Sequence, residues 1–227
     1  PGFMDIILAG STQILFFTFL MGLLWGVGGL SYGLGVRYLG MSLGNSVVLG
    51  FCAAFGALVP PIYYAFVPTN GKVSVIEMLS KPGGQLVLLG VLVCIVGIAI
   101  SGWAGMMKER ELTDEEKKKA VPEFSIVKGL VIAILSGVLS SFFNFGIEAG
   151  KPLAEAAVAA GNNPLFQNNV TFVVILWGGL TTNFIWTSIL SIKNKSYKDF
   201  TNKATPIKKN IIFCAMAGTL WFMQFFF

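Results

Sequence analysis

Six long stretches of apolar residues, separated by short polar segments, dominate the sequence. Each has close to the roughly 20 residues that a helix needs to cross a bilayer core of about 30 Å. None shows the alternation of apolar and polar residues that the strands of a membrane β-barrel would require. The pattern predicts an all-α fold, a polytopic transmembrane helical bundle. Its spans are expected at about 14–36, 41–64, 85–107, 126–150, 168–192 and 210–227.

The composition supports this fold class. Of the 227 residues, 55% are hydrophobic and 12% are charged, whereas an ordinary soluble domain has about 25% charged residues. A soluble single domain, a disordered chain and a disulfide-rich secreted scaffold are therefore excluded. The chain has no histidine, and its three cysteines lie in apolar stretches without CxxC spacing. Neither a metal site nor a cofactor is expected, and catalysis by a histidine triad is excluded.

The distribution of cations predicts how the helices are oriented. If successive connections alternate between the two sides, thirteen of the 16 Lys and Arg residues fall on one side of the membrane. Only Lys72, Lys81 and Lys151 fall on the other. The positive-inside rule then predicts that the connections 108–125 and 193–209 are cytoplasmic loops. These cations are explained by orientation in a bilayer, so the net charge of +5 does not indicate nucleic-acid binding.

Two carboxylates are candidates for chemistry at membrane depth, where an ionisable group is costly. Glu148 and Lys151 are three residues apart and would share a helix face, while Pro152 would interrupt the backbone hydrogen bonding next to them. Glu155 follows in the same segment. Such a carboxylate would bind a sugar hydroxyl or take up a proton. The alternative is a solvated ion pair at the outer end of a helix.

Neutral polar and aromatic residues inside the predicted spans would suit a sugar, which has hydroxyl edges and apolar C–H faces. The alternative explanations are hydrogen bonds between helices and aromatic belts at the membrane interface. Pairs of glycines spaced four apart, such as Gly22 and Gly26, indicate close helix packing with low specificity. The candidates for cavity lining are Trp25, Tyr32, Asn45, Asn144 and Asn183.

The run from Gly22 to Leu34 and its continuation from Arg37 to Gly44 resemble the L-rhamnose–proton symporter family of the drug/metabolite transporter superfamily. Similar segments also occur at 88–92, 108–110, 128–130, 151–157 and 220–227. The resemblance implies ten helices in two inverted halves, of which this chain would supply the third to the eighth. The ends at Pro1 and Phe227 would then be internal to a longer protein. The family pattern has an amide at Glu148 and retains Glu155, which favours Glu155 for proton coupling.

The function implied by the resemblance is proton-driven uptake of L-rhamnose, or a related sugar, across a bacterial inner membrane. The partners would be the sugar, protons and the lipid bilayer. Two alternatives remain: an exporter of metabolites or drugs from the same superfamily, and a non-transporting membrane subunit whose polar residues only pack helices. An enzyme is not expected, because the spans contain no histidine and no paired aspartates.

Overall fold

The computed structural model describes residues 2–68, 71–111, 125–202 and 206–225, without the side chains of 108–110. All regular elements in these ranges are helices. They are α1 (Phe3–Ala9), α2 (Thr12–Leu39), α3 (Met41–Phe66), α4 (Val75–Ser80), α5 (Pro82–Glu111), α7 (Ile126–Ser140), α8 (Phe142–Ala149), α9 (Lys151–Ala159), η1 (Pro164–Phe166), α10 (Asn169–Lys193), η2 (Ser196–Phe200) and α11 (Ile207–Met223).

Five stretches of helix in the described residues are long and apolar enough to cross a membrane, so the prediction of a polytopic helical membrane protein is confirmed. Each overlaps one of the first five predicted spans. The fourth is a composite of α7, α8 and α9 and reaches Ala159, nine residues beyond the predicted end at 150. Most of the predicted loop 108–125, at 112–124, lies outside the described residues.

The sixth predicted span, 210–227, corresponds to α11, which has 17 residues and is not among the five long apolar stretches. At a rise of about 1.5 Å per residue, this helix is somewhat shorter than the bilayer core. Residues 226–227 at the end of this prediction, and 203–205 in the predicted loop 193–209, lie outside the described part of the chain.

Helix α2 is central, and glycines bring it close to its neighbours on two faces. A Cβ atom added at Gly22 would collide with the backbone carbonyl of Ile175 in α10, and one at Gly26 would lie 2.8 Å from the Cβ of Thr182. On another face, a Cβ at Gly28 would lie 2.6 Å from the backbone nitrogen of Ser140 in α7. Small residues thus let the helix backbones approach closely. The van der Waals packing that results helps helices to associate in lipid.

Hydroxyl groups join the same helices by hydrogen bonds to backbone carbonyls. Ser136 in α7 donates to the Gly28 carbonyl at 2.8 Å, and Thr182 in α10 donates to the Leu23 carbonyl at 2.9 Å. Thr171 in α10 donates to the Gly150 carbonyl at 3.0 Å. Because lipid offers no competing hydrogen-bond partners, these contacts fix how α2, α7, α8 and α10 sit together.

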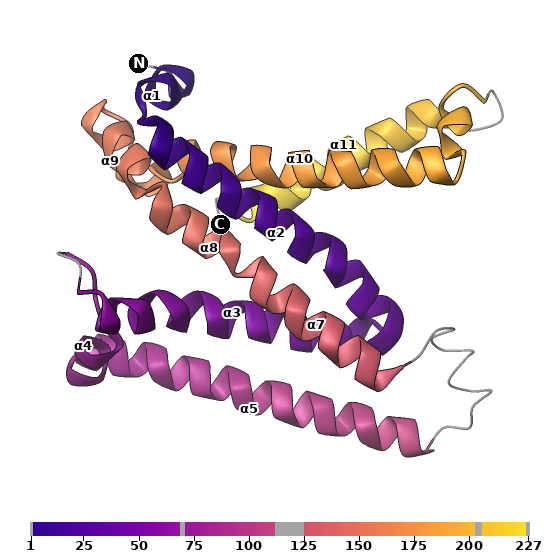
Figure 1. The fold of residues 1–227 in the computed structure, drawn as a ribbon, viewed down its shortest axis with the longest axis horizontal. Coiled ribbons are helices and arrows are strands. Elements are labelled where there is room, and N and C mark those ends of the chain that lie inside the picture. Colours follow the sequence, from indigo (N-terminus) through magenta and orange to yellow (C-terminus); the bar gives the residue numbers. More distant parts are fainter. Residues whose placement is uncertain (1, 69–70, 112–124, 203–205, 226–227) are drawn as a thin grey trace.

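The helices form a bundle with two distinct ends (Figure 1). Helices α3 and α5 pack against each other on one side, α10 and α11 lie on the opposite side, and α2 runs between them with α7 and α8. Helices α1, α4 and α9 lie at one end, called here the α4 end. The C-terminal ends of α5 and α10 lie at the other, called the η2 end.

Two breaks shape the composite fourth span. At Ser141 the chain passes from α7 to α8, and the Ser141 hydroxyl donates to the Val138 carbonyl at 2.6 Å. At Gly150 it passes from α8 to α9. Pro152 lies in the first turn of α9, where the N–H group that proline lacks would have no intrahelical partner. A Cβ at Gly150 would collide with Thr171 of α10. The last turn of α8 lies beside the C-terminal end of α3, at the α4 end.

The packing of α2 generates a prediction with a neighbouring control. Gly28→Ala should destabilise the protein by about 1–3 kcal/mol, because the added methyl group meets the α7 backbone and the two helices must separate. Gly29→Ala, where a Cβ meets nothing within 4 Å, should be neutral or stabilising by up to about 1 kcal/mol. Melting temperatures in one detergent would compare the two variants. Equal melting temperatures would show that the α2–α7 contact is not close.

Candidate functional site

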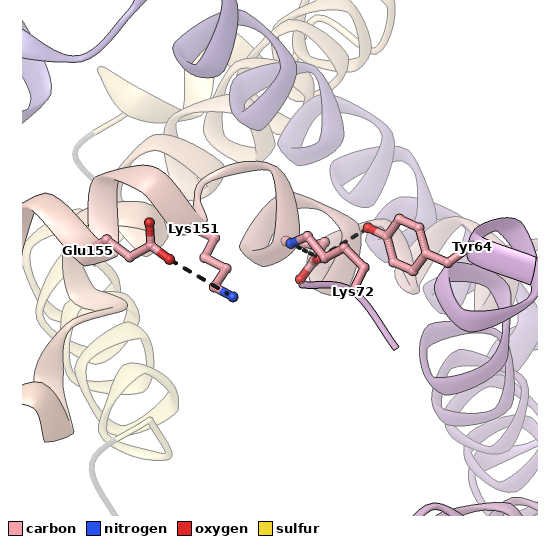
Figure 2. Close-up of polar contacts among 5 residues, drawn as sticks. Tyr64, Lys72, Lys151 and Glu155 are labelled. Atoms are coloured by element: carbon pink, nitrogen blue, oxygen red, sulfur yellow. Dashed lines mark hydrogen bonds and ion pairs between the residues drawn. The ribbon is translucent and has the colours of Figure 1, made fainter. Parts of the chain in front are cut away.

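Glu148 is the centre of a polar group at the α4 end. It lies in the last turn of α8, and its Oε1 atom accepts a hydrogen bond from the Tyr64 hydroxyl at 3.1 Å. The same oxygen atom forms an ion pair with the Lys72 ammonium group. Tyr64 is in the last turn of α3, and Lys72 lies between α3 and α4. Figure 2 shows Tyr64 and Lys72 converging from different segments.

The partner of Glu148 differs from the sequence-based hypothesis of a pair with Lys151. Lys151 instead lies 3.9 Å from Glu155, one turn further along α9, and both side chains are more than half exposed. Gly150 separates α8, which ends at Ala149, from α9, which begins at Lys151. Glu148 and Lys151 therefore lie in different helices and not on the face of one continuous helix. Lys151 and Glu155 form a surface pair separate from the Glu148 group (Figure 2).

A strip of polar groups continues from Glu148 along α8 and α3. Asn144 is four residues before Glu148 and shares its helix face. The Asn144 amide lies against Gly56 of α3, where a Cβ would come within 2.5 Å of its nitrogen. Because Pro60 has no N–H, the Gly56 carbonyl loses its usual intrahelical partner. We call Gly56, Tyr64, Lys72, Asn144 and Glu148 together the polar strip.

The other predicted residues lie elsewhere in the structure. The Tyr32 hydroxyl donates to the Asn45 side-chain oxygen and thereby links α2 to α3, beside an apolar cluster that includes Leu39 and Val47. Asn183 is exposed, and its amide donates to the Gly179 carbonyl of its own helix at 2.8 Å. The Tyr32–Asn45 hydrogen bond corresponds to the alternative of hydrogen bonds between helices, whereas the Asn183 bond lies within α10. Neither contact joins the polar strip.

Trp25 lies in a cluster of aromatic rings between α2, α8, α10 and α11. Its ring centroid is 5.2 Å from that of Phe143 and 6.0 Å from that of Trp221. Phe225 stacks on Phe143 at 5.6 Å and contacts Phe172 at 4.7 Å. Phe143 precedes Asn144 in α8, so the aromatic cluster and the polar strip occupy different faces of one short helix.

The apolar groove between α3 and α5 is unsuited to a polar ligand. It has a volume of about 450 Å³ and is lined by residues such as Phe55, Ile62 and Ile98. A sugar in this groove would lose its hydrogen bonds to water without replacement. The polar strip lies on another face of α3, where Asn144, Tyr64 and Glu148 offer both donors and acceptors.

Sequence reasoning missed Tyr64 and Lys72. Lys72 had a signal, because it is one of only three cations on the side of the membrane that is poor in positive charge. The signal for Tyr64 was weaker: it follows Pro60 and Pro61, which lack the N–H groups that would donate to the Gly56 and Ala57 carbonyls of α3. No sequence pattern indicated that both would reach a residue more than 70 positions later.

Comparison with known proteins identifies the family. The model of the L-rhamnose-proton symport protein family matches residues 1–227. The chain belongs to this family. Its members are transporters rather than enzymes, as the resemblance of the Gly22–Gly44 region had indicated.

Several relatives within the symporter family are similar over the whole chain. The L-rhamnose-proton symporters of Yersinia pestis strain Pestoides F and Yersinia pseudotuberculosis strain IP 31758 are both 37% identical to it over 230 residues. That of Yersinia pestis strain Antiqua is 36% identical. The chain spans 63% of the length of these relatives. No solved structure gave a significant match.

The contacts of the two carboxylates predict different contributions to stability. Glu148→Gln should destabilise the protein by about 1 kcal/mol or more, because it weakens a charged hydrogen bond and an ion pair between segments. Glu155→Gln should cost less than about 0.5 kcal/mol, because it removes an exposed pair within one helix. Melting temperatures at neutral pH would rank the two variants. The reverse order would contradict the described contacts of Glu148.

Proposed function

We propose that this chain forms the greater part of a secondary transporter that couples uptake of L-rhamnose, or a related sugar, to entry of protons across a bacterial inner membrane. Family membership over all 227 residues supports the transport class and the substrate class. The observation that carries the coupling to protons is Glu148, a carboxylate in an apolar span held by groups from two other segments.

The polar strip supports a sugar as the substrate. The amide of Asn144 and the hydroxyl of Tyr64 can each both donate and accept hydrogen bonds, as sugar hydroxyls require. The carboxylate of Glu148 accepts hydrogen bonds when charged and can donate one when protonated. A single carboxylate of this kind allows sugar and proton to be bound in one place, which is the physical requirement for symport.

The family pattern described above, with an amide at Glu148, favours Glu155 for coupling. From the contacts in this chain we infer instead that Glu148 is the better candidate. The Glu155 carboxylate is exposed and paired only weakly within α9, so its protonation would disturb little else. Protonation of Glu148 would weaken contacts to α3 and to the segment after it. Alternating access requires that binding at one site change how helices are held together, and Glu148 meets that requirement.

The architecture that we propose for the whole protein has ten helices in two inverted halves, of which this chain supplies six. The five long apolar stretches and α11 would be these six helices. The arrangement in Figure 1 supports it, because the C-terminal ends of α5 and α10, which lead into the lysine-rich connections, lie at the same end of the bundle. The η2 end would be cytoplasmic and the α4 end extracytoplasmic.

Cysteine labelling tests the proposed orientation. Ser196→Cys in η2 should react with a membrane-impermeant maleimide only after the cells are opened, whereas Lys81→Cys, between α4 and α5, should react in intact cells. All native cysteines, including Cys52, Cys94 and Cys214, would be replaced by alanine in both variants. Reaction of both positions from the same side would contradict the span count. Reaction of Ser196→Cys in intact cells, and of Lys81→Cys only in opened cells, would show the orientation opposite to the proposed one.

Transport measurements in cells without their own L-rhamnose uptake test the function. The gene that encodes this chain, at its natural length, should confer entry of labelled L-rhamnose together with alkalinisation of the medium when the sugar is added. Glu148→Gln should abolish alkalinisation and accumulation, because the neutral amide cannot exchange a proton. Glu77→Gln, in an exposed pair on α4, is the matched control and should retain both signals.

The same assay separates the competing explanations. Loss of coupling in Glu155→Gln with full coupling in Glu148→Gln would transfer the role to Glu155. Uptake without alkalinisation in the unmodified protein would retain the sugar and reject proton coupling. Absence of both signals for L-rhamnose and related sugars would favour an exporter or a non-transporting subunit.

A further inference from the structure

Lys72 is unusually enclosed for a lysine near the end of a membrane span. Its side chain is 23% exposed, compared with 62% for Lys81 and 51% for Lys151, the other cations at the α4 end. Lysine side chains normally extend into water, because the ammonium group is strongly hydrated. Lys72 instead contacts the Glu148 carboxylate, which is itself only 37% exposed.

The ion pair adds a charged contact to the packing and the hydrogen bonds, Tyr64–Glu148 and Tyr32–Asn45, that connect the same parts of the bundle. Lys72 lies between α3 and α4, and α4 packs against both α3 and α5. Glu148 lies in α8, which packs mainly against α2 and also contacts α10 and α3. The pair therefore ties the α3–α4–α5 side of the bundle to the α2–α8–α10 side at the α4 end (Figure 2).

The charged and titratable groups around Glu148 come from three places. Tyr64 of α3 donates a hydrogen bond, and Lys72 supplies the ion pair. Lys151 of α9 adds a weaker electrostatic attraction, but it is paired with Glu155 instead. Lys72 is therefore the cation whose attachment to Glu148 depends most directly on the charge of that carboxylate.

We propose that Lys72 is the internal counter-ion with which the transported proton competes for Glu148, an inference that rests on the proposed symport. When Glu148 is a carboxylate, Lys72 binds it and holds the two sides of the bundle together at the α4 end. A proton from extracytoplasmic water adds to the carboxylate and makes it a neutral carboxylic acid. Lys72 keeps its own proton, loses its counter-ion and moves into water, and the α4 end is released.

This role makes Lys72 a positioning residue rather than a group that touches the sugar. Release is favoured because a neutral carboxylic acid offers the ammonium group no Coulomb attraction to offset the loss of hydration. The neutral acid also gains a donor, which a sugar hydroxyl or a backbone carbonyl can accept. Proton binding would thus open the α4 end and prepare the polar strip for the sugar in one step.

Spin-label distances across the ion pair test the proposal directly. Labels would be attached at Ile76→Cys on α4 and Ala159→Cys on α9, both exposed positions, in the full-length protein with its native cysteines replaced by alanine. At alkaline pH we expect one narrow distance distribution, and at acidic pH a longer and broader one. Glu148→Gln and Lys72→Gln should give the longer distribution at both pH values.

Two further variants show whether the charge of Lys72 is what matters. Lys72→Arg should restore the narrow distribution at alkaline pH and its response to pH. Lys81→Gln, which removes an exposed lysine at the same end, should leave the response unchanged. A distance that does not depend on pH, or a response that persists in Glu148→Gln, would overturn the proposal.

Transport assays on the same variants distinguish this inference from the proposed function. Lys72→Gln should lose sugar-dependent alkalinisation, and Lys72→Arg should recover it. Wild-type symport without any pH-dependent change in distance would overturn the role of Lys72 and leave symport intact. The opposite result is a distance that depends on pH, and loses this dependence in Glu148→Gln, in a protein that moves no protons with L-rhamnose. It would support Lys72 as the counter-ion of Glu148 and reject the proposed symport.

Discussion

The close approach of α2 to α7 and α10 is the constraint on which the rest of the structure depends. In lipid, apolar side chains gain little by leaving their surroundings, so helices associate where their backbones can come near and where hydroxyl groups bond across the gap. Gly22, Gly26 and Gly28 provide the first condition, and Ser136 and Thr182 provide the second. These contacts fix α7 and α10, and through them the short helix α8.

The placement of α8 in turn creates the polar strip. Helix α8 runs for eight residues between Ser141 and Gly150, and its last turn contacts the end of α3 through Glu148 and Tyr64. Asn144 and Glu148 then face Gly56 and Tyr64. A carboxylate in an apolar span is tolerable only if other groups compensate for its lost hydration, and Lys72 and Tyr64 do so here. The packing core and the ion pair that we propose to switch thus lie in adjacent parts of one bundle.

The sequence was sufficient to predict a polytopic helical membrane protein, because the length and hydropathy of a membrane span are local properties of the chain. It also singled out Glu148, since an isolated carboxylate in an apolar run is visible without a structure. It failed to predict the partner of Glu148. The expected pairing with Lys151 assumed one continuous helix, and the break at Gly150 changes which residues share a face. Lys72 and Tyr64 reach Glu148 only through the packing of distant helices, which no local pattern encodes.

The most direct test of the account is whether Glu148 gains a proton when sugar binds. Infrared difference spectra of the purified full-length protein, recorded on addition of L-rhamnose near neutral pH, would report the carbonyl stretch of a protonated carboxylic acid. If Glu148 carries the coupled proton, this band appears with the sugar, shifts on isotope labelling of glutamate and is absent in Glu148→Gln. A band that persists in Glu148→Gln, or sugar binding without such a band, would contradict it.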